Sequence, residues 1–148
     1  MNNLNLILPE IFLSLAIMFL LILGVFKKNS SRLIQNISLI VLIITAVITF
    51  NETLSIKQIL LFNDSIVIDY LSSFMKIVTL LTAFLVLVIS SNYLKTFKIF
   101  KIEYPILILS SVLGMMVMIS SNDLIVFYMG LELQSLALYV LATFNRDQ

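Results

Sequence analysis

The chain has 148 residues, of which 61% are hydrophobic and 11% are charged, and its mean hydropathy is +1.13. Soluble domains carry about 25% charged residues, so this composition excludes water as the main solvent. A net charge of +1 excludes an extended basic surface for nucleic acid. The absence of cysteine and histidine excludes disulfides, thiolate-bound iron–sulfur clusters and the usual haem or zinc ligands. Any redox chemistry is therefore expected in another subunit.

Long apolar runs predict an all-α integral membrane protein. A helix of about 17–25 apolar residues crosses the hydrocarbon core of a bilayer. Such runs lie at residues 6–26, 33–50, 71–90, 105–120 and 124–144. They predict five transmembrane helices in a single membrane domain, residues 1–148, whose apolar surface faces lipid or partner subunits.

The first helix is expected to begin at Pro9 and Glu10. Proline suits the first helical turn, and a carboxylate suits the positive end of the helix dipole. Glu10 is therefore expected to be a cap at the membrane interface. Residues 51–69, by contrast, are too apolar for a free loop and too interrupted by charge for a span. We expect them to lie against the outer face, partly as a short strand or hairpin.

The basic residues predict the orientation of the helices. Three of the nine lysines and arginines lie within residues 27–32, three within residues 95–101 and one at position 146. With five crossings, these segments all lie on one side of the membrane. The positive-inside rule makes that side the cytoplasm or matrix. The N-terminus is therefore expected outside and the C-terminus inside.

Two ionisable side chains, Lys76 and Glu132, fall clearly inside the expected spans. Lys76 lies about 7–8 Å into the third span, where its long stem allows the ammonium either to reach the interface or to act within the membrane. Glu132 lies about 12 Å beyond Leu124, near the middle of a core about 30 Å thick. A carboxyl group at that depth can serve as a proton relay, or it can hold two helices together by hydrogen bonds.

Hydroxyl groups follow Glu132 along one side of its helix. Tyr128, Ser135 and Tyr139 project within about 60° of Glu132, whereas Gln134 projects to the opposite side. These three side chains are the candidates for lining a proton route. In the fourth span, Ser110, Ser111 and Gly114 favour close helix packing rather than chemistry.

Three motifs carry a resemblance to a known family. The most specific is Gly-Leu-Glu-Leu-Gln-Ser-Leu-Ala-Leu-Tyr-Val-Leu at residues 130–141. It resembles the fifth transmembrane helix of the antiporter-like subunits of respiratory complex I, above all subunit 2 of NADH:ubiquinone oxidoreductase, called N in bacteria. Weaker matches, Leu-Pro-Glu-Ile at 8–11 and Asp-Tyr-Leu-Ser-Ser-Phe-Met-Lys at 69–76, agree in order and place.

This resemblance implies a membrane subunit that takes part in proton translocation. In the family, the glutamate matched by Glu132 belongs to a proton half-channel and is paired with a lysine on a later, broken helix. The resemblance implies that NADH, FMN, iron–sulfur clusters and quinone are bound by other subunits, and that this chain holds no cofactor. The expected partners are membrane lipids and other membrane-arm subunits, including a chain that supplies the later helices. The charge-derived orientation agrees with the family's topology.

One departure is that family members have about fourteen helices, whereas this chain ends at Gln148, just after the fifth. It is expected to be either a truncated product or one piece of a subunit encoded in parts. The absence of a signal or transit peptide and a composition rich in Asn, Ile, Lys and Phe favour a mitochondrially encoded chain of the inner membrane. A bacterial plasma membrane is the alternative. Two other functions stay open: a structural membrane-arm fragment without a proton path, and a subunit of a cation/proton antiporter.

Overall fold

The computed structural model describes residues 7–27, 31–54, 58–96 and 103–143. Five helices dominate these residues, and all five are long and apolar enough to cross a membrane. Their bounds are α1 Leu8–Phe26, α2 Ser31–Thr53, α3 Tyr70–Thr96, α4 Glu103–Ser120 and α5 Leu124–Ala142. The five expected spans are confirmed. Several observed helices are longer than the apolar runs, because polar terminal turns continue a helix beyond the part that hydropathy detects.

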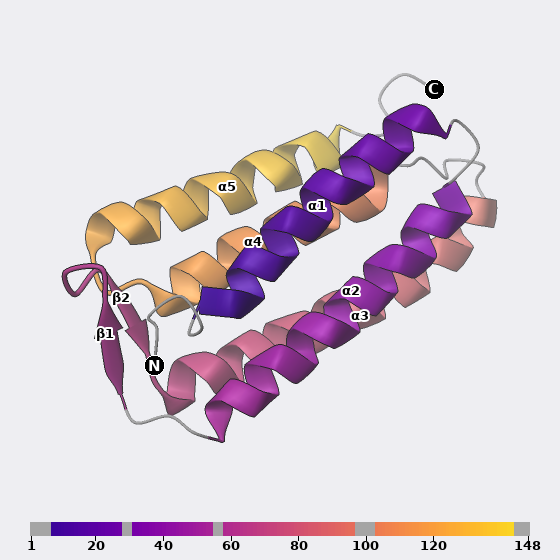
Figure 1. The fold of residues 1–148 in the computed structure, drawn as a ribbon. Helices are drawn as coiled ribbons and strands as arrows, with labels where there is room; N and C mark the ends of the chain where they lie inside the picture. Colours follow the sequence, from indigo (N-terminus) through magenta and orange to yellow (C-terminus); the bar gives the residue numbers. More distant parts are fainter. Residues whose placement is uncertain (1–6, 28–30, 55–57, 97–102, 144–148) are drawn as a thin grey trace.

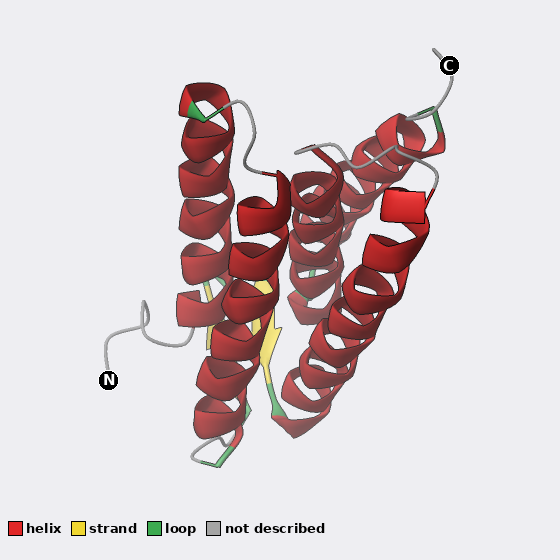
Figure 2. Ribbon diagram, turned by 90° about the vertical axis from the view of Figure 1, so that its right-hand side faces the viewer, coloured by secondary structure: helices red, strands yellow, loops and turns green. Residues whose placement is uncertain are grey.

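The helices run in alternating directions and form an elongated bundle (Figure 1). In the perpendicular view of Figure 2 the strands lie behind the helices, toward one end of the bundle. At this hairpin end α2 ends, α3 begins and α4 gives way to α5. The start of α1 and the end of α5 lie at opposite ends of the bundle, as an odd number of crossings requires.

Residues 59–68 form the short hairpin expected between the second and third spans. Strands β1 (Ile59–Leu61) and β2 (Ile66–Ile68) pair in an antiparallel arrangement. Three consecutive residues of the turn, Phe62, Asn63 and Asp64, have positive φ. Asn and Asp tolerate this left-handed conformation well, whereas Phe rarely adopts it.

Hydrogen bonds attach this hairpin to the turn between α4 and α5. The Asn122 backbone N–H donates to the Ser65 carbonyl at 2.9 Å, and the Asn122 side-chain amide donates to the Asp64 carbonyl at 2.8 Å. An isolated bridge joins Ile66 to Ser121. The hairpin therefore closes one end of the bundle and satisfies its own backbone groups there.

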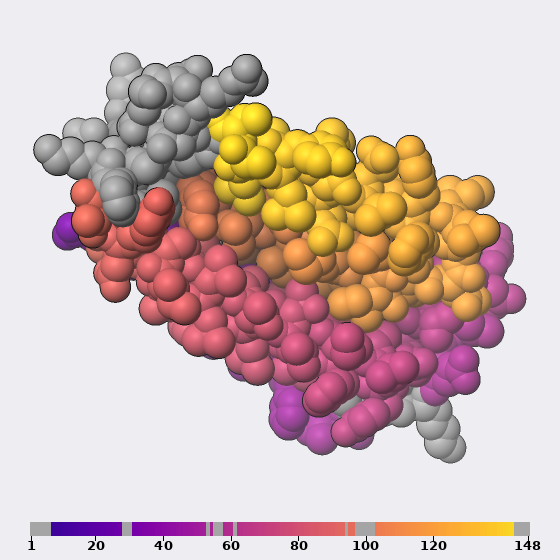
Figure 3. Space-filling model, turned by 180° about the vertical axis from the view of Figure 1, so that it is seen from behind, coloured from indigo at the N-terminus to yellow at the C-terminus, as the bar shows by residue number. Residues whose placement is uncertain are grey.

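Helices α1 to α4 share one hydrophobic core. Each contributes a stripe of buried residues at helical spacing, such as Leu80, Ala83 and Leu87 on α3. The other members of the core are Leu13, Ile17, Leu20, Ile34, Val41, Leu42, Ile106, Leu109, Val112 and Met116. Helix α5 lies outside this core, and its buried residues are Gly130 and Ala137. Figure 3 shows α5 running along the surface of the bundle.

Two glycines allow α5 to approach α4 closely. A Cβ atom on Gly114 of α4 would lie 2.7 Å from the Gln134 backbone nitrogen and 2.9 Å from the Gly130 carbonyl oxygen. A Cβ atom on Gly130 would lie 2.9 Å from both the Gly114 carbonyl oxygen and the Met118 nitrogen. These neighbours are backbone atoms, which cannot move as a flexible side chain can. The packing role expected for Gly114 is confirmed, and Gly130 is its counterpart.

The substitution Gly130→Ala should therefore push α5 away from α4 and destabilise their packing by about 1–3 kcal/mol, the usual range for an overpacked interface. Thermal unfolding of the purified protein in detergent would measure this loss. Leu124→Ala is the matched control on the same helix, because Leu124 is highly exposed. Equal stability of the two variants would contradict the close approach.

The alternating helices also test the orientation predicted from charge. A cysteine introduced at Lys27, after α1, and one introduced at Asp64, in the hairpin, should react with membrane-impermeant reagents from opposite sides of sealed vesicles. The positive-inside rule places Lys27 on the cytoplasmic or matrix side. Labelling of both positions from the same side would show that the arrangement of spans is wrong.

Candidate functional site: charged groups within the spans

A buried ion pair joins the first and third helices. The Lys76 ammonium on α3 is bonded to the Glu10 Oε1 atom on α1. Lys76 is only 3% exposed and Glu10 only 8%. Of the two possibilities for Lys76, the structure favours the one in which its ammonium acts inside the bundle, and Glu10, expected as a cap, is also half of a buried ion pair. The cause is that each group finds its countercharge inside the bundle, which offsets part of the cost of leaving water.

Both charged residues continue the buried stripes of their helices. Glu10 projects within about 80° of Leu13, Ile17 and Leu20, the core positions of α1. Lys76 has the same relation to the core positions of α3, the nearest of which is Leu80. The apolar stripes that pack the bundle thus bring the two charges together near its hairpin end.

A third charged group belongs to this site. Glu52 lies in the last turn of α2, is partly buried, and interacts electrostatically with both Glu10 and Lys76. The hydropathy pattern instead places Glu52 in residues 51–69, after the second expected span. Helical periodicity in the sequence could have revealed its buried position, because Glu52 lies on the same face of α2 as the core-facing polar residue Thr45. We call Glu10, Glu52 and Lys76 the three-charge cluster.

Polar side chains extend from this cluster along the buried face of α2. Thr49, Thr45 and Ser38 are almost fully buried, and each hydroxyl donates to the carbonyl four residues earlier. Near the other end of the helix, the Gln35 amide donates to the Leu87 carbonyl of α3 at 2.8 Å. These bonds satisfy the hydroxyl donors, so the stripe costs little to bury. Between Ser38 and Thr45, the buried apolar residue Leu42 interrupts this row of polar side chains.

Glu132 has a different environment. It lies on the exposed side of α5, and Tyr128, one turn earlier, interacts with its carboxylate. Tyr139 is also exposed and Ser135 is half-buried. Gln134 instead has its backbone nitrogen against Gly114 of α4, which agrees with its expected position opposite Glu132. The two charges predicted within the spans therefore belong to separate sites, one in the core and one on an open helix face.

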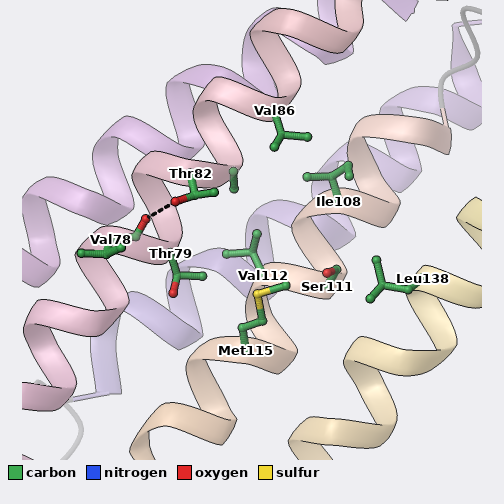
Figure 4. Close-up of a pocket in the computed structure, with 10 residues that line it drawn as sticks. Val78, Thr79, Thr82, Val86, Ile108, Ser111, Val112, Met115 and Leu138 are labelled. Atoms are coloured by element: carbon green, nitrogen blue, oxygen red, sulfur yellow. Dashed lines mark hydrogen bonds between the residues drawn. The ribbon is translucent and has the colours of Figure 1, made fainter.

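An apolar groove of about 330 Å³ opens between α3, α4 and α5 (Figure 4). Val78, Val86 and Ile108 line it together with Met115 of α4 and Leu138 of α5. The two threonines on its wall, Thr79 and Thr82, donate to carbonyls of their own helix. The groove thus offers apolar contact rather than a polar binding site.

Comparison with known proteins gives relatives that carry the same name. No family model matches the chain. NADH-quinone oxidoreductase subunit N of Pelagibacter ubique is 68% identical over 148 residues, which is 100% of this chain and 31% of the relative. The subunits N of Maricaulis maris and Paramagnetospirillum magneticum are 45% and 44% identical over 99% and 95% of this chain.

The chain is a homologue of NADH-quinone oxidoreductase subunit N. The resemblance carried by residues 130–141 is thereby confirmed over the whole chain. The chain spans about 30% of the length of the Maricaulis relative. This coverage is consistent with the N-terminal portion of a subunit N.

The buried ion pair gives a direct test of the site. Glu10→Leu should destabilise the protein by about 3 kcal/mol, the low end of the range for breaking a buried pair, because Glu52 still interacts with Lys76. The double variant Glu10→Leu/Lys76→Leu removes both charges and should recover much of that loss. Thermal unfolding in detergent of the wild type, both single variants and the double variant measures the coupling. Strictly additive effects would show that the two groups do not form a pair.

Proposed function

We propose that this chain is part of a membrane-arm subunit of a proton-translocating NADH-quinone oxidoreductase, in which Glu132 carries a proton within the membrane. The observation that supports this proposal most strongly is the 68% identity to a subunit N over the full chain. The relatives are named as subunits of this oxidoreductase, and the five spans fit a membrane subunit. The role of the chain in proton translocation follows from the resemblance of the motif around Glu132.

The location of Glu132 supports a relay. It lies eight residues after the start of α5 at Leu124, so it is about 12 Å along a helix that spans the membrane. A carboxylate at this depth on an exposed helix face would contact lipid unless another helix covered it, and hydrocarbon cannot solvate the charge. Tyr128 supplies one polar neighbour. The lysine that balances Glu132 is expected on a helix that covers this face.

The exposed side of α5 supports the proposal about partners. Large apolar residues cover it, including Ile125, Met129 and Leu136, while its buried side rests on the two glycines. In the assembled enzyme we expect this face to contact the later helices of the same subunit or those of a neighbouring membrane-arm subunit. Lipid would cover the remaining apolar surface.

The redox groups belong elsewhere in this proposal. The chain has no cysteine or histidine to ligate an iron–sulfur cluster. NADH, FMN, the clusters and quinone are therefore assigned to other subunits, and this chain contributes proton movement driven by their electron transfer. The names of the relatives favour the oxidoreductase over a free-standing cation/proton antiporter.

The organisms of the relatives favour one of the two expected cellular locations of this protein. Pelagibacter ubique, Maricaulis maris and Paramagnetospirillum magneticum are bacteria, which disagrees with the mitochondrial location expected from composition. They favour the alternative, a multi-pass protein of a bacterial plasma membrane.

The substitution Glu132→Gln tests the relay. Glutamine keeps the shape and hydrogen bonding of the side chain but cannot exchange the carboxyl proton. NADH-driven proton uptake into sealed vesicles should fall well below the wild-type level, while the amount of assembled complex stays unchanged. Tyr128→Phe should give a smaller loss, because it removes only a neighbouring hydroxyl.

Glu103→Gln is the matched control, since Glu103 is an exposed carboxylate in the first turn of α4. It should leave proton uptake at the wild-type level. Wild-type uptake in Glu132→Gln would instead favour the structural alternative, in which the carboxylate only holds helices together. Assembly is measured on the same membranes by native electrophoresis.

A further inference from the structure

The apolar groove between α3, α4 and α5 lies in the middle of the membrane-spanning part of the bundle (Figure 4). Its wall on α3 extends from Val78 to Val86, a rise of about 12 Å along the helix axis. On α4, Ser111 lies about 12 Å from the start of the helix at Glu103 and about 13 Å from its end at Ser120. The groove is therefore an elongated slot that runs along the helices at the depth of the hydrocarbon core.

This groove is open on the outer surface of the bundle. Val78 and Val86 are each 42% exposed, and Thr82 between them is also exposed. The core residues Ala83 and Val112, in contrast, are buried where they line it. A molecule that lies against α3, α4 and α5 can thus insert apolar groups from the membrane without disturbing the core.

The Ser111 hydroxyl is available as a donor in this groove. Ser111 lines the groove and is only 3% exposed. The hydroxyls of Thr79, Thr82 and Ser110 donate to carbonyls of their own helices, whereas that of Ser111 donates no hydrogen bond among the described residues. A buried donor without an acceptor is costly. The occupant of the groove is therefore expected to supply an acceptor at the depth of Ser111.

The depth of Ser111 argues for a helix rather than a lipid as the source of this acceptor. Phospholipid acyl chains carry no hydrogen-bond acceptor, and the polar groups of the lipid lie at the membrane interfaces. Water is absent from the hydrocarbon core. A transmembrane helix, by contrast, brings Ser, Thr, Asn or Gln side chains to this depth, and such side chains form hydrogen bonds across helices.

The lining of the groove also fits a helix. Thr79, Ala83 and Ser111 are small, and small residues at a helix interface let two backbones approach closely. A helix with its side chains is about 10–12 Å across, so the side chains of one face would enter a groove of about 330 Å³. The relative from Pelagibacter ubique supports the presence of further helices, because this chain spans only 31% of its length.

We propose that the groove between α3, α4 and α5 is the docking site of a further transmembrane helix, which inserts apolar side chains between Val86 and Leu138 and supplies a side-chain acceptor to the Ser111 hydroxyl. This site adds a second contact to the one that the proposed function places on the open face of α5. It rests on the proposed function for the identity of the partner chain. The docking itself does not depend on Glu132.

Photo-crosslinking in native membranes tests which molecule occupies the groove. The photoreactive residue p-benzoylphenylalanine is introduced in place of Thr82, whose exposed side chain lines the groove. Illumination should join it to a peptide from an apolar helix, which mass spectrometry of the purified chain identifies. Leu81 is the matched control position, because it is exposed on the same helix but projects about 100° away and does not line the groove. It should give little of that peptide.

The variant Ser111→Ala tests the hydrogen bond separately from the shape of the groove. It removes the donor and leaves a small side chain, so the helix should still dock but bind less tightly. At a detergent concentration that halves the wild-type crosslink, the ratio of crosslinked to free chain should fall about threefold, the effect of an average interhelical hydrogen bond in a membrane. Ser110→Ala is the matched control and should leave this ratio unchanged, because the Ser110 hydroxyl already donates to the Ile106 carbonyl.

The docking site is rejected if the crosslink from position 82 joins a phospholipid, a quinone or another small molecule, or if the inserted chain gives no crosslink. Equal ratios in Ser111→Ala and the wild type would reject the hydrogen bond. The same photoreactive residue in place of Val86 provides a second position on the groove wall if the chain altered at Thr82 does not accumulate.

The same membranes separate this proposal from the proposed function. A crosslink to a helix of a protein outside the oxidoreductase would support the docking site and contradict the proposed function. A crosslink to lipid, together with loss of proton uptake in Glu132→Gln, would reject the docking site and leave the relay supported. A crosslink to a helix of the oxidoreductase, with normal uptake in Glu132→Gln, would support the site and contradict the relay.

Discussion

Hydrocarbon cannot hydrogen-bond to a protein, and this constraint governs the structure. Each helix satisfies most of its backbone groups internally, and the buried hydroxyls of α2 donate to carbonyls within the same helix. The charged groups need partners from other helices. Glu10 and Lys76 meet across α1 and α3 because both lie on the core-facing stripes of their helices. The hairpin end of the bundle is thereby organised around an ion pair rather than around apolar packing alone.

Helix α5 is packed differently from the other four helices. Helices α1 to α4 bury a common core, whereas α5 is attached to α4 through Gly114 and Gly130. This close approach holds Glu132 on a helix whose other side is open. The proposed function expects helices from the rest of the enzyme to cover this face. The open face and the proposed relay residue are thus parts of one arrangement.

The sequence by itself determined the membrane-spanning class, the five spans and the hairpin, because hydropathy and segment length follow directly from how apolar side chains partition into lipid. It also determined the resemblance around Glu132, since a motif of consecutive residues needs no tertiary information. The tertiary structure alone decided the environments of Glu10, Glu52 and Lys76. Each of these lies near a segment end or one turn inside it, where sequence position fits an exposed group as well as a buried one. Only the packing of α1, α2 and α3 brings them together, because a countercharge distant in sequence decides whether a charge is stable away from water.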